Sequence, residues 1–524
     1  MHRRSRLAVA LLTVLVLVTT AGCTLPSFAP KGADSPARPG TNGGAASSAP
    51  GATAKWRPCP EVPRDLVGRT GAGMDYDCAT VKVPRDWADT TSGETYDIAL
   101  IRVRSERQQN RIGSLLLNPG GPGGSGVDLA VYLSFGQALG GLPTEITDRF
   151  DIVGFDPRGV SRSSPVKCIS STDQDASFAA DPDPAGQAEF DQLAALNKKI
   201  ADGCAQKYGD RLGTFSTEQA ARDLDALRAA VGDEKLTYLG YSYGTLLGAT
   251  YAQLFPKNVR ALVLDGAVDP TEGFEAGSEQ QAKGFERAFA NFTTWCSANA
   301  ATCPIAPDAR GAVTDALAKA ESAPVRARDG RSATTGWIFV GLISSLYTES
   351  GWTELAEAIA SLETGDASGI FELADSYADR EPDGTYSNLF DANLAVNCAD
   401  TDGAPTVAEV RALQAEWRTK YPLFGSALAV GMLPCVFWGG QRDPYPVGKA
   451  EGAPPILVVG TTGDPATPYE NTADLATMLG VGQVLTWEGE GHTAYPTTAC
   501  IRTAVDGYLI DLRMPREGLR CPAK

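Results

Sequence analysis

The chain has 524 residues, of which 63 are acidic and 46 are basic, so its formal net charge is −17. A chain this acidic repels phosphate backbones, and we expect no nucleic-acid partner. Its length exceeds what one simple core normally contains, so we expect a main domain with a large insertion.

The first 22 residues have the features of a signal peptide. A basic start is followed by an apolar run of about a dozen residues and then by small residues. The run is short for a transmembrane helix. Residues 21–23, Ala-Gly-Cys, resemble a bacterial lipobox, although Thr20 stands where leucine is most common. We therefore expect an exported protein with Cys23 as a lipidated first residue, and secretion without a lipid is the alternative.

Residues 23–54 are rich in proline, glycine, alanine and serine, which predicts a flexible tether rather than a folded segment. The chain contains 11 cysteines, and without Cys23 an even number remains, as is typical of disulfides in an oxidising compartment. Spacing does not fix connectivity, but we predict that neighbours in the sequence pair. These pairs would be Cys59–Cys78, Cys168–Cys204, Cys296–Cys303, Cys398–Cys435 and Cys500–Cys521.

Seven short apolar runs, rich in β-branched residues, predict buried strands. They cover residues 98–103, 114–118, 150–155, 236–240, 261–265, 455–460 and 483–487. Helical patterns separate them, so the sequence predicts an α/β fold with a mostly parallel sheet and helices on both faces. In such sheets the ligand crevice lies outside the carboxyl ends of the strands, and the polar motifs described next follow strands.

A G-x-S-x-G pentapeptide at residues 240–244 places Ser242 between a predicted strand and a helix predicted for residues 245–255. The flanking glycines permit a tight turn that holds the serine hydroxyl outward, which is typical of a hydrolase nucleophile. The alternative is a structural Gly-Ser turn.

A glycine-rich loop at residues 118–126 follows the second predicted strand. In hydrolases of this type such a loop supplies one oxyanion donor, and the residue after the nucleophile supplies the other. We therefore predict the backbone N–H groups of Gly121 and Tyr243 as donors. The loop lacks the phosphate-binding motifs that would indicate a nucleotide site.

His492 is the only histidine outside the predicted signal peptide, so it is the one candidate for an imidazole base. Asp464 and Asp265 both follow predicted strands, and the order Ser, Asp, His fits either acid. We favour Asp464, because its strand directly precedes the one that leads to His492, and expect Asp265 to stabilise a turn. Asp156, in an Asp-Pro-Arg-Gly motif, is expected to be structural.

Six motifs occur in order at residues 118–123, 156–159, 238–252, 264–266, 463–468 and 489–493. With them the chain resembles the secreted actinobacterial tripeptidyl aminopeptidases, which are α/β-hydrolases with a TAP-like C-terminal domain, related to proline iminopeptidases. The likeness covers residues 55–522. It implies an α/β-hydrolase core at 55–270 and 453–524, with a mainly helical cap at 271–452. It also implies a triad of Ser242, Asp464 and His492, and oxyanion donors at Gly121 and Tyr243.

Four helices are predicted within the cap, at residues 279–296, 311–321, 337–347 and 352–362. A cap of this kind restricts substrates to chain ends. An aminopeptidase must also bind a free α-ammonium group, which needs a carboxylate near the cleft. Glu279 and Asp400 are candidates, although most acidic residues of a cap are simply solvated.

The expected function is that of a serine aminopeptidase that releases tripeptides from free N-termini through an acyl-enzyme. The partner is a peptide substrate, membrane contact is limited to the lipid, and no cofactor or metal is expected because no histidine–cysteine cluster has zinc spacing. A carboxylesterase with the same triad is the alternative, since fold and triad do not separate the two activities. A non-catalytic binding protein is disfavoured by the complete triad. The oligomeric state stays open.

Overall fold

The computed structural model describes residues 53–59 and 73–524. The predicted signal peptide, Cys23 and nearly all of the predicted tether lie outside the described residues. None of the helices in the described part is both long and apolar enough to cross a membrane.

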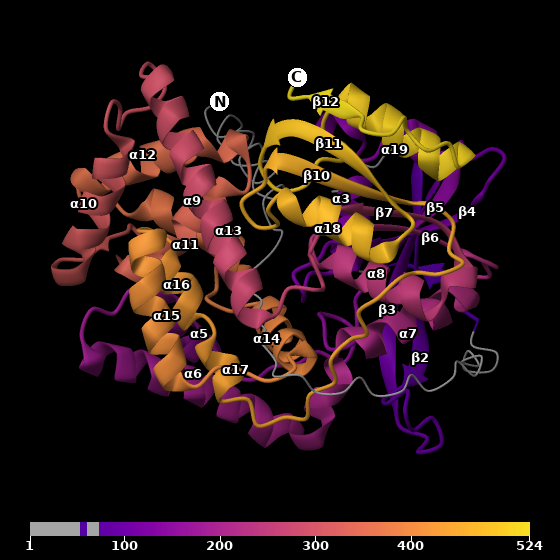
Figure 1. Ribbon diagram of the computed structural model, residues 1–524, viewed down its shortest axis with the longest axis horizontal. Coiled ribbons are helices and arrows are strands. Elements are labelled where there is room, and N and C mark those ends of the chain that lie inside the picture. The colour runs from indigo at the N-terminus through magenta and orange to yellow at the C-terminus, as the bar shows by residue number, and fades with distance from the viewer. Residues whose placement is uncertain (1–52, 60–72) are drawn as a thin grey trace, which may run out of the picture.

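A ten-stranded sheet forms the centre of the part of the molecule on the right of Figure 1. Its order is β1-β2-β3-β5-β4-β6-β7-β10-β11-β12. The first three pairings are antiparallel, and all the others are parallel. The strands are β1 Arg57–Pro58, β2 Met74–Pro84, β3 Thr95–Ser105, β4 Gly113–Asn118, β5 Phe150–Phe155, β6 Leu236–Tyr241, β7 Val259–Asp265, β10 Ile456–Gly463, β11 Gly482–Glu490 and β12 Arg520–Pro522. The mostly parallel sheet is therefore confirmed.

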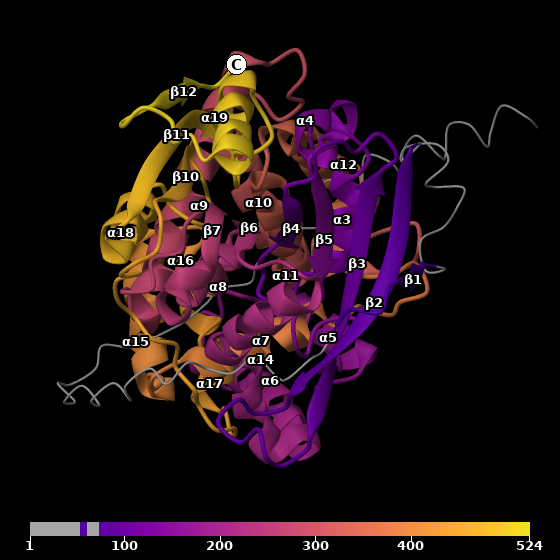
Figure 2. The ribbon, with the colours of Figure 1, turned by 90° about the vertical axis from the view of Figure 1, so that its right-hand side faces the viewer.

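All seven predicted strands lie in this sheet, whose twist is visible from the side, with β1 and β2 towards one edge and β11 and β12 towards the other (Figure 2). The sequence did not predict β2, which pairs with β3 along its full length of 11 residues. The inner strands β4, β5 and β6 are buried at every position, as expected for parallel strands covered on both faces.

Helices cover both faces of the sheet. One face carries α3 Gly126–Leu133, α4 Thr144–Thr147 and α19 Ala499–Asp511, and the other carries α7 Thr217–Ala230, α8 Tyr243–Leu254 and α18 Glu470–Leu479. The apolar side of α7 is buried, with Leu224 and Leu227 fully inaccessible. Short 3-10 helices occupy Gln137–Leu139, Gly209–Phe215, Pro256–Asn258 and Glu349–Gly351.

A layer of helices lies beside the sheet, on the left of Figure 1. Between β7 and β10 the chain forms α9 Phe274–Ala298, α10 Ala309–Ser322, α11 Thr335–Leu346, α12 Trp352–Glu363, α13 Ser368–Ala378, α14 Leu389–Asp400, α15 Val407–Lys420, α16 Gly425–Val430 and α17 Leu433–Val436, with a two-stranded β8 Val325–Arg326 and β9 Ser332–Ala333. The four predicted helices correspond to α9–α12. Two earlier helices, α5 Ser171–Ala179 and α6 Gln187–Tyr208, pack against α11 and α17. The helical layer thus includes residues outside the predicted 271–452 range.

Five disulfides join the ten cysteines of the described residues, and each links neighbours in the sequence as predicted. One of them, Cys398–Cys435, fixes α14 to α17. Five disulfides are typical of a protein in an oxidising compartment.

Candidate active site

Ser242 occupies the turn between β6 and α8. Its φ of 55° is rare for a residue with a side chain, and such strain is typical of a hydrolase nucleophile at a strand–helix turn. A Cβ atom on Gly240 would stand 2.3 Å from the carbonyl oxygen of Gly244. The pentapeptide glycines are therefore required because strand and helix approach so closely.

The glycine-rich loop after β4 lies directly against this turn. A Cβ atom on Gly120 would stand 2.8 Å from the Cβ of Ser242 and 3.0 Å from the backbone nitrogen of Tyr243. Gly120 and Gly121 also have φ values of 94° and 111°, which glycine adopts without strain. The structure therefore brings the loop, the serine and the first residue of α8 together, and Gly121, Ser242 and Tyr243 line one cavity.

His492 and Asp464 are in direct contact. The imidazole Nδ1 lies 2.9 Å from each oxygen of the Asp464 carboxylate, which is fully buried. That carboxylate also accepts hydrogen bonds from the backbone N–H groups of Ala466, Thr467 and Thr493, at 3.0, 2.9 and 3.2 Å. The Thr467 hydroxyl donates to it at 3.0 Å and lies 3.3 Å from Nδ1. These contacts fix the carboxylate, which in turn holds the imidazole ring in one orientation.

Asp265, the other predicted acid candidate, forms hydrogen bonds with both the serine turn and the loop after the histidine. Its backbone oxygen accepts a hydrogen bond from the Ser242 N–H at 2.8 Å. Its carboxylate accepts from the backbone N–H groups of Ala494 and Tyr495, just after His492. Burial raises the pKa of Asp265 to about 7, and these backbone donors oppose the rise. Asp265 thus fixes the loop behind the imidazole, in line with the structural role predicted for it.

Gly266, the residue after Asp265, lies beside the histidine, while Asp265 itself contacts the serine. A Cβ atom on Gly266 would stand 3.2 Å from Cε1 of His492. Ser242 and His492 therefore lie on either side of the turn that ends β7. Parallel strand ends bring them together although 250 residues separate them in sequence.

Asp156 also has a structural position. Its carboxylate accepts hydrogen bonds from the Ser125 hydroxyl at 2.6 Å and from the Val127 N–H at 3.2 Å. Both donors stand where the glycine-rich loop enters α3. Burial raises the pKa of Asp156, and Ser125 and Arg162 oppose that rise. Asp156 thus fixes the far end of the glycine-rich loop.

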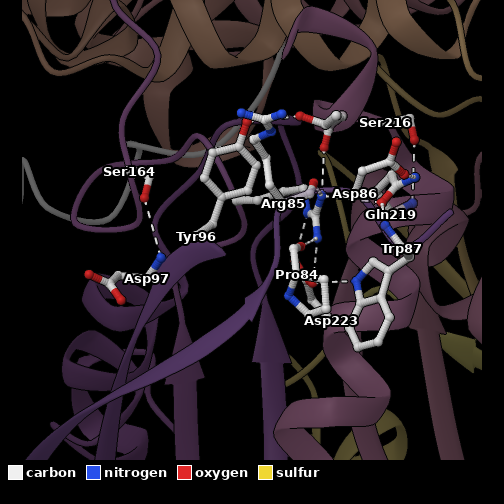
Figure 3. A network of polar contacts seen from close by, with 12 residues as sticks. Pro84, Arg85, Asp86, Trp87, Tyr96, Asp97, Ser164, Ser216, Gln219 and Asp223 are labelled. Atoms are coloured by element: carbon white, nitrogen blue, oxygen red, sulfur yellow. Dashed lines mark hydrogen bonds and ion pairs between the residues drawn. The ribbon is translucent and has the colours of Figure 1, made fainter. Parts of the chain in front are cut away.

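Arg158 of the same motif is buried in a polar network. Figure 3 labels several members of this network, among them Pro84, Trp87 and Asp223. Its guanidinium group donates to both oxygens of Asp223, at 2.7 and 2.6 Å, and to the backbone oxygens of Pro84 and Arg85. The Trp87 ring nitrogen also donates to Asp223 at 2.8 Å. Fully satisfied buried networks of this kind rigidify a fold, so the motif holds β2 against α7.

The helical layer reaches the catalytic loops at two places. The Tyr347 carbonyl, at the end of α11, accepts a hydrogen bond from the His492 N–H at 2.7 Å, and the two rings meet edge to face at 5.3 Å. Arg287 of α9 donates to the Asp464 carbonyl at 3.1 Å. The layer therefore helps to hold the histidine and its acid.

Helix α14 contacts a residue next to each of the two predicted oxyanion donors. The Asn393 amide donates to the Pro122 carbonyl at 3.1 Å, next to Gly121. At the other end of the helix, both Asp400 oxygens accept hydrogen bonds from Thr217, at 2.7 Å from its N–H and 2.6 Å from its hydroxyl. The same hydroxyl lies 2.6 Å from the phenol oxygen of Tyr243. Helix α14 thus connects the glycine-rich loop to the Thr217–Tyr243 contact.

The cavity beside Ser242, named here the chamber, is lined by residues from the core and from the helical layer. Three carboxylates stand in its wall, namely Asp269, Glu272 and Asp400. Burial raises the pKa of Glu272, with a further rise from the charge of Asp269. Asp269 and Glu272 were not predicted, and the only signal for them is their place just after the strand that ends at Asp265.

The two carboxylates that sequence analysis considered for ammonium binding have other partners. Glu279 lies outside the chamber lining, 3.0 Å from the Lys420 ammonium group and 3.2 Å from the Tyr421 hydroxyl. Asp400 lines the chamber and accepts two hydrogen bonds from Thr217, and burial raises its pKa to about 8, so the group is largely uncharged at neutral pH. Within the described residues, no cluster of three or more metal-ligating side chains occurs.

Comparison with known proteins identifies the family. The family described as alpha/beta hydrolase fold matches residues 113–325, and the one described as TAP-like protein matches residues 421–521. The chain is 37% identical to serine protease Hip1 of Mycobacterium tuberculosis, covering 90% of this chain and 91% of that protein. It is 36% identical to carboxylesterase B of the same organism, over 99% of both chains. It is 32% identical to tripeptidyl aminopeptidase of Streptomyces lividans, over 85% of this chain and 83% of that one. The chain therefore belongs to the α/β-hydrolase family of serine hydrolases that carry a TAP-like C-terminal region.

Proposed function

We propose that this protein is an exported serine aminopeptidase that releases tripeptides from peptides with a free N-terminus. The observation that carries the proposal is the acidic wall of the chamber beside Ser242. In the part of the chain that the structure describes, none of its three carboxylates pairs with a lysine or arginine. A substrate ammonium group is the partner that such carboxylates lack. The names of two relatives, a serine protease and a tripeptidyl aminopeptidase, agree with a peptide substrate.

In this proposal Ser242 is the nucleophile, His492 the base and Asp464 the acid that orients the imidazole. The contact between Nδ1 and Asp464 makes Nε2 the nitrogen that takes the serine proton. The serine oxygen bonds to the scissile carbonyl carbon, and the N–H groups of Gly121 and Tyr243 stabilise the oxyanion. The amine then leaves with the proton from the imidazolium. A water molecule, deprotonated by His492, then attacks the acyl-enzyme carbonyl carbon. The bond to Ser242 breaks, the serine regains its proton from the imidazolium, and the peptide is released.

We assign the substrate ammonium group to Asp269 and Glu272 rather than to Asp400 or Glu279. Asp269 accepts hydrogen bonds from the N–H and the hydroxyl of Thr271, two residues on, and among the described residues Glu272 accepts only from Gln280. Carboxylate oxygens have further acceptor sites, so both groups can take a charged donor. The raised pKa of Glu272 is what an unpaired, partly buried carboxylate shows before a cation arrives.

Carboxylesterase activity is the second candidate. A relative at 36% identity bears the name carboxylesterase B, and an ester needs no ammonium site. The same triad serves both reactions, so the chamber carboxylates are the feature that separates the two.

Export, and a lipid on Cys23, are also part of the proposal. The five disulfides support an oxidising compartment, and the N-terminal sequence supports signal cleavage before Cys23. Mass spectrometry of the mature N-terminal peptide tests this part. A diacylated Cys23 is expected, and an unmodified N-terminus would favour secretion without an anchor.

The function is tested with three fluorogenic substrates: a free-amine tripeptide amide, the same peptide N-acetylated, and a short acyl ester. We expect cleavage of the free-amine peptide only, and its loss in Ser242→Ala. Glu272→Gln should raise KM for that peptide about tenfold, the scale of one charge-assisted contact. Glu279→Gln, which changes an acid outside the chamber, is the matched control. Hydrolysis of the ester alone would establish the esterase instead.

A further inference from the structure

A second cavity, named here the apolar cavity, lies among the helices beside the chamber and has a volume of about 200 Å³. Helices α5, α6, α9, α11, α14 and α16 contribute to its wall. Most of its lining is apolar and buried, with prominent contributions from Phe178, Phe285, Phe339, Val340 and Ile343. Figure 1 places these helices together in the layer at the left.

The apolar cavity adjoins the chamber that holds Ser242. Two buried amide side chains, Gln281 of α9 and Asn397 of α14, line both spaces. The Gln281 amide nitrogen donates to the Ala466 carbonyl at 3.1 Å, and the Asn397 amide nitrogen donates to the Asn393 side chain at 2.9 Å. Both boundary residues are therefore fixed, one of them to the loop of the catalytic acid.

The volume of the apolar cavity indicates the size of the group that it can hold. Packed protein interiors contain few voids larger than a water molecule. A dry apolar cavity of roughly 150 Å³ already binds benzene. A space of about 200 Å³ thus has room for one aromatic ring or one branched aliphatic side chain. An occupant of that kind restores the contacts that the lining lacks when the cavity is empty.

The chemistry of the lining favours an uncharged occupant. Among the described lining residues, Asp391 is the only charged one, and its carboxylate accepts a hydrogen bond from the Cys168 N–H at 2.9 Å. A lysine or arginine side chain in this space would have no other charge to meet, and burial of an unpaired charge is costly.

The boundary between the two spaces stands next to the acidic wall of the chamber. Asn397 and Asp400 are three residues apart on α14 and therefore share a face of that helix. Gln281 belongs to α9, which begins just after Glu272. The shared boundary thus lies on the side of the chamber where the substrate's amino end would bind.

We propose that the apolar cavity is a specificity subsite for one large apolar side chain in the released, N-terminal part of the substrate peptide. The inference rests on the proposed aminopeptidase function and names the substrate class more closely. The peptide backbone stays in the chamber, and one aromatic or branched aliphatic side chain passes Gln281 and Asn397 into the cavity.

The test compares four free-amine tripeptide amides: all-alanine, and three that carry a single leucine at the first, second or third position. In the native protein, leucine at one of these positions should raise kcat/KM at least about tenfold over alanine, as expected for a filled apolar pocket. Val340→Phe, which fills the cavity, should abolish that advantage and leave the all-alanine peptide within about twofold. Ala318→Phe adds the same ring on the exposed face of α10 and should keep the preference.

Val340→Ala gives a second measurement, which does not depend on tolerance of a larger side chain. It enlarges the cavity and should shift the preference at the same position from leucine towards phenylalanine. Equal rates for all four peptides, or a leucine preference that survives Val340→Phe, would overturn the subsite. Ester hydrolysis without cleavage of any tripeptide would overturn the aminopeptidase function, and the subsite with it.

Discussion

Replacement of Asp400 by asparagine should change how the stability of the protein depends on pH. The Asp400 carboxyl is enclosed at the chamber wall, where loss of hydration raises its pKa from 3.8 to about 8, although hydrogen bonds from Thr217 lower it. The nearby charge of Asp443 adds to the rise. Between these two pKa values the folded protein holds a proton that the unfolded chain has released.

The direction follows from linkage. A raised pKa in the folded state stabilises the fold below about pH 4, and this contribution is lost as the pH rises towards about 8. A fully shifted group changes the free energy of unfolding by about 1.4 kcal/mol per pH unit, and the partial solvent exposure of Asp400 screens part of this change. We therefore expect the free energy of unfolding of the native protein to fall by about 2–3 kcal/mol, relative to Asp400→Asn, between pH 5 and pH 8.

The assay is denaturant unfolding of both proteins at several pH values in this range. Other carboxyls titrate in both proteins, so the difference between the two curves isolates Asp400. Asp402→Asn removes an exposed carboxylate two residues further along and controls for the loss of one charge. At pH 7 Asp400→Asn should keep kcat/KM within about threefold, because a mostly neutral acid is replaced by a neutral amide. Parallel stability curves for the two proteins would refute the reasoning.

Three further predictions concern the surroundings of the site. Thr467→Val removes the hydroxyl that donates to Asp464 and should lower kcat about tenfold with little change in KM, whereas Thr467→Ser should restore it. Asn393→Ala releases the glycine-rich loop and should lower kcat about tenfold for the free-amine peptide; a change in KM alone would contradict this positioning role. Replacing both Cys398 and Cys435 by serine opens a link across 37 residues and should cost about 3–4 kcal/mol, measured by denaturant unfolding; an unchanged midpoint would disprove it.

The positions of the candidate catalytic residues were predictable because each follows a strand. The strands at 236–240, 455–460 and 483–487 lie parallel in the sheet, so Ser242, Asp464 and His492 come to the same edge. The scarcity of histidine made the base easy to select. Neighbouring cysteines also paired as predicted, since short loops bring such residues together.

The surroundings of the site were not predictable, because they depend on contacts between distant segments. Thr217 and Asp400 are 183 residues apart, and no local pattern marks their contact. The sequence offered Glu279 as a candidate, but its carboxylate contacts Lys420, which is 141 residues away in sequence. Strand β2 was missed because its alternation of exposed and buried positions suits an outer antiparallel strand rather than the apolar runs of the inner strands.

The central claim, that Ser242 is an activated nucleophile, is tested most directly by reaction with a fluorophosphonate and mass spectrometry of the digested protein. We predict one adduct, on the peptide that contains Ser242, which His492→Ala greatly slows and Ser242→Ala abolishes. An adduct on another residue, or one that persists in Ser242→Ala, would contradict the account.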